Sequence, residues 1–490
     1  MASPTQIHVD ADNTGLWRIQ QTPEASDRVS SLLQQDLETH HVFFNNDGFH
    51  NHITHHLLSL YGTGADVSAI QKGYDDNKGY QREARPVHNP KEGSDPPGAA
   101  SGPLADDWYE TTAPQHLGHE SYYPDFLRFF QHDIARRDEE ANKAGSNLAG
   151  WEAVLRDRVF SGTPAAEDLR TRLFAGFLHP LIQLMYGIEW GEPAIVAQGL
   201  AQAAIHKHQG LDDVLYSMEK AADAEKAKTT GHVSILSLFQ EVAQSPQLSS
   251  AAHWDDPNKM RNGVLARALN EMVAVAAKVS VPATEEGLAA RTAEMAEACL
   301  YVASSAALQH PTKYTKFDFF LIHHVNSVPF FLAINSFVWL SVEAKARLLE
   351  WKIRLDLVQY ASRACPPLLD VSKLEAYKSP PSSNASAHPA ADGPSTTNNS
   401  ISPEATEAAA RLFHMEEDGH AIKLVRATGL IEREVRKSLF TRTPCRLLNS
   451  DRVWEALYRL ETDSVFAPGN TYVRTTGLEQ AWEDIPDISK

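Results

Sequence analysis

Cysteine is scarce in this chain, with three occurrences in 490 residues. Cys299, Cys365 and Cys445 lie far apart and show no paired spacing. Neither a disulfide framework nor a cysteine-rich zinc site fits this pattern, which is typical of a reducing compartment. The N-terminus also lacks the basic stretch and the apolar core of a signal peptide, so we expect a cytoplasmic protein.

Basic side chains are in deficit as well. Lys and Arg number 45 against 63 Asp and Glu, and the formal net charge is -18. Nucleic acid and anionic lipid both reward positive charge on a partner, so the composition argues against binding to either. A hydrophobic fraction of 42% and a charged fraction of 22% are typical of a globular protein. The sequence does not indicate an oligomeric state.

A nucleotide-binding signature is missing too. The string nearest to G-x-G-x-x-G runs from Gly62 to Gly64, follows a helical pattern and lacks the later glycine, so it reads as a helix C-cap and turn. We therefore expect no Rossmann domain and no bound flavin. Alternating β-type runs are scarce, whereas apolar residues recur at helical intervals, as at Leu265, Leu269 and Met272. The pattern predicts an all-α fold.

Three stretches depart from this helical pattern. Residues 82–119 are rich in Pro, Gly and Asp and predict a long loop, while residues 379–403 are of low complexity and predict a disordered insertion. The run from Phe317 to Leu340 is long and apolar enough to suggest a membrane span. It carries Asp318 and His323, however, and polar groups of this kind are costly in lipid. A buried helix in a soluble bundle is the better interpretation.

Histidine, by contrast, is abundant, with 22 residues of which several are clustered. On a helix, His52 and His56 are four residues apart and share a face, and with this spacing one helix can offer two imidazoles to one metal. The structural alternative makes His52 and His56 hydrogen-bonded core residues and leaves His50 and His55 in solvent.

More histidines stand in apolar settings, namely His179, His206, His323 and His420. Each of them alone is more often a hydrogen-bonded core residue than a metal ligand. His323 and His324 are adjacent on a predicted helix and cannot both face the same ligand. Several buried imidazoles on separate helices nevertheless indicate a metal within a helical bundle.

Lys352 belongs to an amphipathic helix beside Trp351. It is either a lysine whose ammonium group reaches solvent or a buried lysine with a lowered pKa. A buried lysine of this kind could serve as a ligand, as a catalytic base or as a carbamylation site.

A di-iron carboxylate centre is a rival interpretation of the histidines. The E-x-x-H motif of such centres occurs at Glu38–His41 and again at Glu417–His420. Gly419 is poor in a helix interior, and no matching pair of buried glutamates stands out. The di-iron interpretation is therefore secondary.

Several strings between about Phe49 and Ala427 resemble the questin-oxidase-like proteins of fungal aromatic-polyketide pathways: FHNHITHHLLSLYGTGA, FLHPLIQLMYGIEWGEP, FDFFLIHHVNSVPFFL, LLEWKIRLDLVQYASRACP and EDGHAIKLVRA. Matches lie on both sides of residues 379–403, so we expect one large helical-bundle domain over residues 1–490. The resemblance implies an oxygenase that opens the central ring of an anthraquinone by Baeyer–Villiger-like or dioxygenase-type cleavage, with NADPH as an external reductant in some relatives. Gln183 stands where relatives often carry a histidine, which argues against a ligand role there.

Ground-state O2 reacts poorly with closed-shell organic molecules, so a flavin or a redox metal normally carries such a step. We therefore predict a mononuclear non-haem Fe(II) site that acts on a small aromatic polyketide. Arg354 would offset phenolate charge, and Tyr186 and Trp351 would stack on the planar substrate. The candidate ligands, not all of which need bind, are His56, His179, His206, His323, His420 and Lys352, with His52 in reserve.

Two alternatives stay open. A metal-free oxygenase would use a lysine or histidine base to deprotonate the substrate phenol, whose anion then reacts with O2. A non-catalytic helical protein that binds small molecules would carry its histidines for structure alone.

Overall fold

The computed structural model describes residues 1–490 except for 89–102, 105–106, 227–232, 381–399, 440–446 and 489–490. Within the described residues the regular structure is helical, and the β contacts are isolated bridges such as the one between His40 and Glu83. The predicted all-α fold is confirmed.

The described chain groups into two compact units. The first comprises Met1–Asp212, Ser336–Leu340 and Phe413–Lys423. The second comprises Asp213–Asn335, Ser341–Leu412 and Leu424–Lys490. Each unit is thus assembled from separate stretches of chain. The expectation of a single domain over residues 1–490 stays a prediction.

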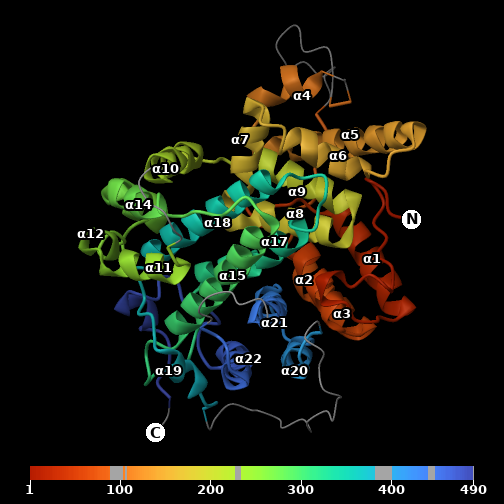
Figure 1. The fold of residues 1–490 in the computed structure, drawn as a ribbon. Helices are drawn as coiled ribbons and strands as arrows, with labels where there is room; N and C mark the ends of the chain where they lie inside the picture. The colour runs from red at the N-terminus through yellow and green to blue at the C-terminus, as the bar shows by residue number, and fades with distance from the viewer. Residues whose placement is uncertain (89–102, 105–106, 227–232, 381–399, 440–446, 489–490) are drawn as a thin grey trace. The chain divides into compact units, whose positions relative to one another are not determined.

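The first unit holds the N-terminal helices (Figure 1). They are α1 (Pro23–Thr39), α2 (Ile53–Thr63), α3 (Val67–Lys78), α4 (Trp108–Thr111), α5 (Tyr123–Ala144), α6 (Gly150–Arg158), α7 (Pro164–Leu173), α8 (His179–Trp190) and α9 (Pro193–Ile205). Helix α2 packs on α1, α3 and α8, and α5 packs on α6 and α9. The Asp66 side chain caps α3 by accepting the Ala69 N–H, which satisfies one of the free donors at that helix start.

Helices α8 and α9 approach each other so closely that two positions require glycine. A Cβ on Gly187 would lie 2.5 Å from the backbone nitrogen of Val196, and one on Gly199 would lie 2.7 Å from Cα of Leu184. Any side chain at these positions would force the two backbones apart. The contact holds α8, and with it His179 as its first residue, against α9.

The second unit contains the remaining helices. They are most of α10 (Leu211–Lys226), α11 (Ile235–Gln244), α12 (Pro246–Ser249), the π-helix η5 (Lys259–Val264), α13 (Leu265–Arg267), α14 (Leu269–Ala276), α15 (Glu285–Ala307), α16 (Phe319–Asn326), α17 (Val328–Ile334), α18 (Val342–Ser362), α19 (Val371–Glu375), α20 (Pro403–Leu412), most of α21 (His420–Leu439) and α22 (Asp451–Phe466). Helices α15, α16 and α18 pack together, and α11 and η5 pack on α18.

The apolar run from Phe317 to Leu340 does not form the single buried helix that its sequence predicts. Helix α16 ends before Ser327, and α17 begins there with Pro329 in its first turn. Proline has no N–H and clashes with the preceding turn, so it starts a new helix where it cannot continue the old one. Among the helices of the described residues, none combines the length and the apolarity needed to cross a membrane.

The predicted irregular segments have different outcomes. The expectation of a loop over 82–119 is wrong in part, because α4 and the short 3-10 turn Ala113–Gln115 lie inside it; residues 89–102 and 105–106 lie outside the described residues. Of the predicted disordered insertion 379–403, residues 381–399 lie outside the described residues, and Pro403 is the first residue of α20.

Candidate metal centre

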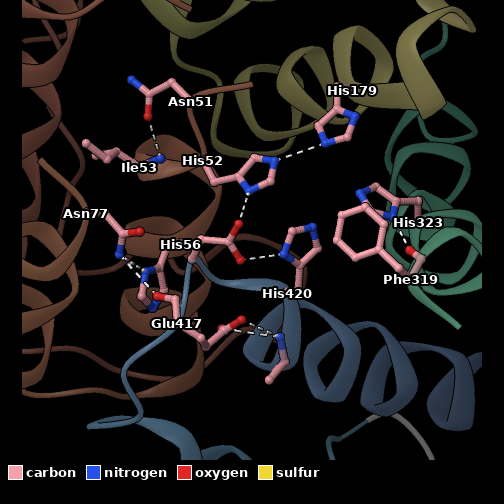
Figure 2. A network of polar contacts seen from close by, with 12 residues as sticks. Asn51, His52, Ile53, His56, Asn77, His179, Phe319, His323, Glu417 and His420 are labelled. Carbon is pink, nitrogen blue, oxygen red and sulfur yellow. Dashed lines mark hydrogen bonds and ion pairs between the residues drawn. The ribbon is translucent and has the colours of Figure 1, made fainter. Parts of the chain in front are cut away.

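Three histidines of the first unit come together at three helix starts. His52 is the N-cap of α2, His179 is the first residue of α8 and His420 is the first residue of α21. All three side chains are buried, and each offers one ring nitrogen to a group whose members lie within 4.8 Å of one another. Segments that are far apart in sequence therefore supply one compact cluster of imidazoles (Figure 2).

The Nδ1 atom of each of these histidines already faces an acceptor. Asp418 accepts from Nδ1 of His52 at 3.0 Å and from Nδ1 of His420 at 2.5 Å, and the carbonyl of Gly176 accepts from Nδ1 of His179 at 2.7 Å. A neutral imidazole carries only one N–H, so a proton on Nδ1 leaves Nε2 as a lone pair. This partnering assigns the same tautomer to all three rings.

The consequence is visible between His52 and His179, whose Nε2 atoms lie 2.9 Å apart. Two lone pairs at this distance repel each other unless a cation stands between or beside them. Two ligands that bind one metal at about 2.1 Å and at right angles are roughly 3.0 Å apart, which matches the observed separation. The donor set of neutral imidazoles, each oriented through its other nitrogen, fits a first-row transition metal.

The charges around the cluster support neutral rings. Burial lowers the pKa of His52 to about 3, and Lys423 lowers it further while Asp418 opposes the shift. Burial likewise lowers the pKa of His420, against the attraction of Asp418. Burial works to raise the pKa of Asp418, but His420 and His52 hold it well below its ordinary value. Both shifts favour the neutral imidazoles of His52 and His420, the form that metal binding requires.

His56, which the sequence favoured over His52, lies apart from this cluster. The helix begins only at Ile53, so His52 stands outside it with φ -103° and ψ 1° and does not share the face of His56. The Nδ1 atom of His56 instead faces the side-chain amide of Asn77 at 3.4 Å. The structure thus groups the reserve candidate with His179 and His420, and the ligand role of each residue stays a prediction.

Gly419 explains how Asp418 and His420 reach the cluster. Its φ of +94° is favourable only for glycine, and a Cβ there would lie 2.7 Å from Cβ of His56. The E-x-x-H string at Glu417–His420 is therefore a turn before α21, and the one at Glu38–His41 runs past the end of α1 at Thr39. Neither has the helical i, i+3 geometry of a di-iron carboxylate bundle.

Glu417 also lies near His420 and Asp418, and these three residues form a second possible ligand group. Its carboxylate accepts the backbone N–H of Ala421 at 3.2 Å, so it caps the start of α21. Burial, reinforced by the charge of Asp418, raises the pKa of Glu417 to about 8. A carboxyl that holds its proton is a poor ligand, so the three imidazoles are the better set.

His206 and His50 form a pair next to the cluster. His206 is the C-cap of α9, and its Nε2 lies 2.7 Å from Nε2 of His50. The His50 ring in turn stacks on His179 with centroids 3.9 Å apart and an interplanar angle of 6°. His206 therefore does not lie in the group of three. His50 is buried, whereas the structural alternative placed it in solvent.

His55 is likewise buried, which contradicts the expectation that it faces solvent. Its ring stacks on Tyr186, with centroids 5.3 Å apart and an interplanar angle of 13°. The hydroxyl of Tyr186 pairs with Ser59 Oγ at 2.6 Å, so this predicted substrate platform is already packed on both its ring and its hydroxyl. Gln183 donates to Gln198 at 3.2 Å.

His323 and His324 belong to the second unit, and the cluster of three is defined without them. His323 Nδ1 donates to the carbonyl of Phe319 at 2.5 Å, which again leaves Nε2 as a lone pair. His324 Nδ1 pairs with Asp356. The two neighbours have different partners, as expected for adjacent positions on a helix.

Lys352 is fully buried, so the interpretation in which its ammonium group reaches solvent is wrong. Its Nζ pairs with Asp356, and the Sγ of Cys299 lies 3.4 Å away. Burial works to lower the pKa of Lys352, but the Asp356 carboxylate outweighs it and the pKa is raised. A raised pKa favours the ammonium form, which weighs against a role as a metal ligand or a base; that role stays a prediction.

Arg354 and Trp351, the other predicted residues of α18, lie in the second unit. Arg354 donates to Glu350 at 3.0 Å and lines a cavity of about 360 Å³ whose wall also includes Glu219 and Asp223. Trp351 is fully buried and donates from its indole to Glu219 at 2.6 Å. Its ring is therefore core and offers no open face to a planar substrate.

The fold and this cluster define an all-α protein with a buried three-histidine candidate metal centre. The chain belongs to the questin oxidase-like family, whose model matches residues 49–428, and it is an oxidoreductase of that family. It is 35% identical over 367 residues to a questin oxidase from Aspergillus fumigatus, covering 74% of this chain and 76% of that protein. It is 31% identical over 486 residues to a Baeyer-Villiger monooxygenase from Aspergillus aculeatus, covering 95% and 91%. A Baeyer-Villiger oxidase from Pestalotiopsis fici is 34% identical over 382 residues, covering 77% and 79%.

Proposed function

We propose that this protein is an oxygenase of fungal aromatic-polyketide biosynthesis that opens the central ring of an anthraquinone-type substrate at an Fe(II) ion held by His52, His179 and His420. The observation that carries the metal assignment is the convergence of three buried imidazoles, each with one ring nitrogen within 4.8 Å of the others and each with Nδ1 facing an acceptor. The names of the relatives support the reaction class.

The reaction is an oxygen insertion of the Baeyer–Villiger type. One oxygen atom of O2 enters the bond between a ring carbonyl carbon and its neighbouring carbon, and the other leaves as water. This balance requires two electrons and two protons, which NADPH and one proton can supply. A bound Fe(II) would supply the activation of O2 that closed-shell substrates need.

The chain's own residues have defined tasks in this proposal. Asp418 keeps protons on Nδ1 of His52 and of His420, so that both Nε2 atoms stay available as ligands. The Gly176 carbonyl does the same for His179. Burial of all three rings excludes water and removes competition from protons, because it lowers the pKa of His52 and of His420.

Elemental analysis of untagged protein tests the proposal. We expect near one iron per chain and O2 uptake with a hydroxyanthraquinone. The double variant His52→Ala with His420→Ala should lose both, whereas His132→Ala, which changes a solvent-exposed histidine, should keep both. Metal and turnover retained in the double variant would rule out the ligand assignment.

The metal-free oxygenase is the second candidate, because the second unit holds an oriented histidine base. Asp356 accepts from Nδ1 of His324, so Nε2 of His324 is free to take a proton from a phenol. Protein that still consumes O2 but contains no stoichiometric metal would favour this candidate. Replacement of His324 by glutamine should then abolish turnover.

A further inference from the structure

The second unit contains a cavity of about 360 Å³ between α10, α18 and the loop that precedes α15, and every residue that lines it belongs to this unit. Small-molecule sites in proteins have volumes of roughly 300–1,000 Å³, so the cavity is large enough for a small ligand. Glu219 of α10 joins two of the walls, because it accepts from Arg347 and from Trp351 of α18 at 2.6 Å in both cases. Direct contacts between the helices therefore shape the cavity.

The charges on the cavity wall do not balance. Four carboxylates and two guanidinium groups line it, namely Glu219, Asp223, Glu343 and Glu350 with Arg347 and Arg354. Each guanidinium pairs with one carboxylate of the wall, either Glu219 or Glu350. Asp223 and Glu343 are exposed, and among the described residues neither carboxylate has a hydrogen bond or an ion pair. The cavity therefore has an excess of two negative charges.

Arg354, by contrast, has unused donors in this wall. Its side chain is 1% exposed, and its Nη2 donates to Glu350 at 3.0 Å. Its Nε and Nη1 atoms have no hydrogen-bond partner among the described residues, and no other residue in the lining of the cavity has a buried donor of this kind. Glu350 cannot serve Arg354 alone, because it also accepts the N–H of Val281 at 3.0 Å. A buried charged donor is costly without an acceptor, so this wall favours a ligand oxygen.

These two features make opposite demands on a ligand. A simple anion would satisfy Arg354, but Asp223 and Glu343 would repel it. A simple cation would neutralise the two exposed carboxylates and leave the guanidinium donors unpaired. A molecule that carries both a carboxylate and ammonium groups meets both demands. The bond between a carboxylate and a guanidinium is charge-assisted, and it is among the stronger hydrogen bonds in proteins.

We propose that this cavity binds a basic α-amino acid. The carboxylate of the ligand accepts from Arg354, and its two ammonium groups pair with Asp223 and Glu343. A basic amino acid fits better than a neutral one, because its second ammonium group faces the second uncompensated carboxylate. The proposal uses none of the three histidines of the candidate metal centre, so it does not depend on the proposed function.

The test uses three probes of similar length in calorimetric titrations of the full chain at low ionic strength. L-Lysine carries every group that the proposal requires, cadaverine lacks the carboxylate and L-norleucine lacks the side-chain ammonium group. We expect L-lysine to bind roughly 10- to 100-fold more tightly than cadaverine, the difference typical of a hydrogen bond to a charged group, and also more tightly than L-norleucine. The absence of L-lysine binding, or equal affinity for L-lysine and cadaverine, would overturn the proposal.

Arg354→Lys is the matched variant, because it keeps a positive charge near Glu350 and removes the planar fork of donors. Its affinity for L-lysine should fall roughly 10- to 100-fold, whereas its affinity for cadaverine should stay near that of the wild type. The preference for L-lysine over cadaverine should therefore disappear. If Arg354 is only structural, the variant weakens both probes alike or neither, and an unchanged preference of this kind would refute the proposal.

Glu343→Gln and Asp223→Asn test the other end of the ligand. Both side chains are exposed, so these variants should fold even if Arg354→Lys does not. Each should weaken L-lysine binding roughly two- to fivefold, the contribution of an exposed ion pair. Glu407→Gln is the control, because it removes the same charge from an exposed side chain of α20 outside the lining, and it should keep the wild-type affinity.

Wild-type affinity for L-lysine in both Glu343→Gln and Asp223→Asn would contradict the assignment of the ammonium groups and overturn the proposal. None of these titrations needs metal or turnover. Iron content and O2 uptake therefore report separately on the proposed function.

Discussion

Replacing Asp418 by asparagine should weaken metal binding even though Asp418 touches no metal in the proposed centre. The carboxylate accepts Nδ1–H bonds from His52 and from His420. An asparagine side chain has one carbonyl oxygen and one amide nitrogen, so it can accept from only one of them. The imidazole that faces the amide nitrogen must move its proton to Nε2, where it blocks the lone pair.

The magnitude follows from what is lost. Removing the partner that orients a metal-binding histidine typically reduces metal affinity 10- to 100-fold, or about 1.4 to 2.8 kcal/mol. Here one residue orients two of the three rings, so we expect the upper part of that range. Anaerobic competition with a chromogenic chelator for Fe(II) measures the affinity directly.

Asp75→Asn is the matched control, because it removes the same charge from a surface ion pair with Lys78 on α3. This variant should keep the affinity of the wild type. An Asp418→Asn protein that binds metal as tightly as the wild type would show that the tautomers of His52 and His420 are not set by this carboxylate. The assignment of Nε2 as the ligand atom would then be wrong.

Three further predictions concern other sites. His56→Ala should retain metal whereas His52→Ala loses it, as measured by metal content after desalting. Glu461→Gln should stabilise the protein at high pH. Burial raises the pKa of Glu461 from 4.5 to about 8, so between pH 4.5 and pH 8 the folded state holds a proton that the unfolded state has released. The free energy of unfolding of the wild type therefore falls by about 1.4 kcal/mol per pH unit over this range. Urea unfolding should show equal stability of wild type and variant at pH 5 and a more stable variant above pH 8. Lys352→Met should destabilise the protein by about 3–5 kcal/mol, because it leaves Asp356 buried without its counter-ion. Replacing Asp356 by leucine in the same protein should recover most of the lost stability. Urea unfolding measures both changes.

The helical class and two of the cluster's histidines could be predicted because both leave local signals. Helical spacing of apolar residues is a property of short windows, and His179 and His420 stand in apolar strings on separate helices. Pro329 also indicated the break between α16 and α17, but the continuous apolar character of the run favoured a single helix.

The choice of His52 over His56 could not be made from spacing. It depends on where α2 begins, and a shift of one residue at a helix start decides whether a side chain lies on the helix face or outside it. Asp418 left only a weak local signal, two positions before His420 and next to a glycine that a turn requires. That the same carboxylate also meets His52 is a tertiary fact, as is the pairing of Lys352 with Asp356 across one turn of a buried helix.

The discontinuous first unit has a consequence for how the protein is made. His52 and His179 leave the ribosome early, but the segment Phe413–Lys423, which brings Asp418 and His420, is translated much later. At 5–20 residues per second the interval between His179 and His420 is roughly 10 to 50 seconds. During that time a nascent chain can present two imidazoles without the carboxylate that orients one of them. If the proposed centre binds metal, its full affinity should therefore arise only near the end of synthesis, and a product of premature termination before Phe413 should not compete with the full-length protein for metal.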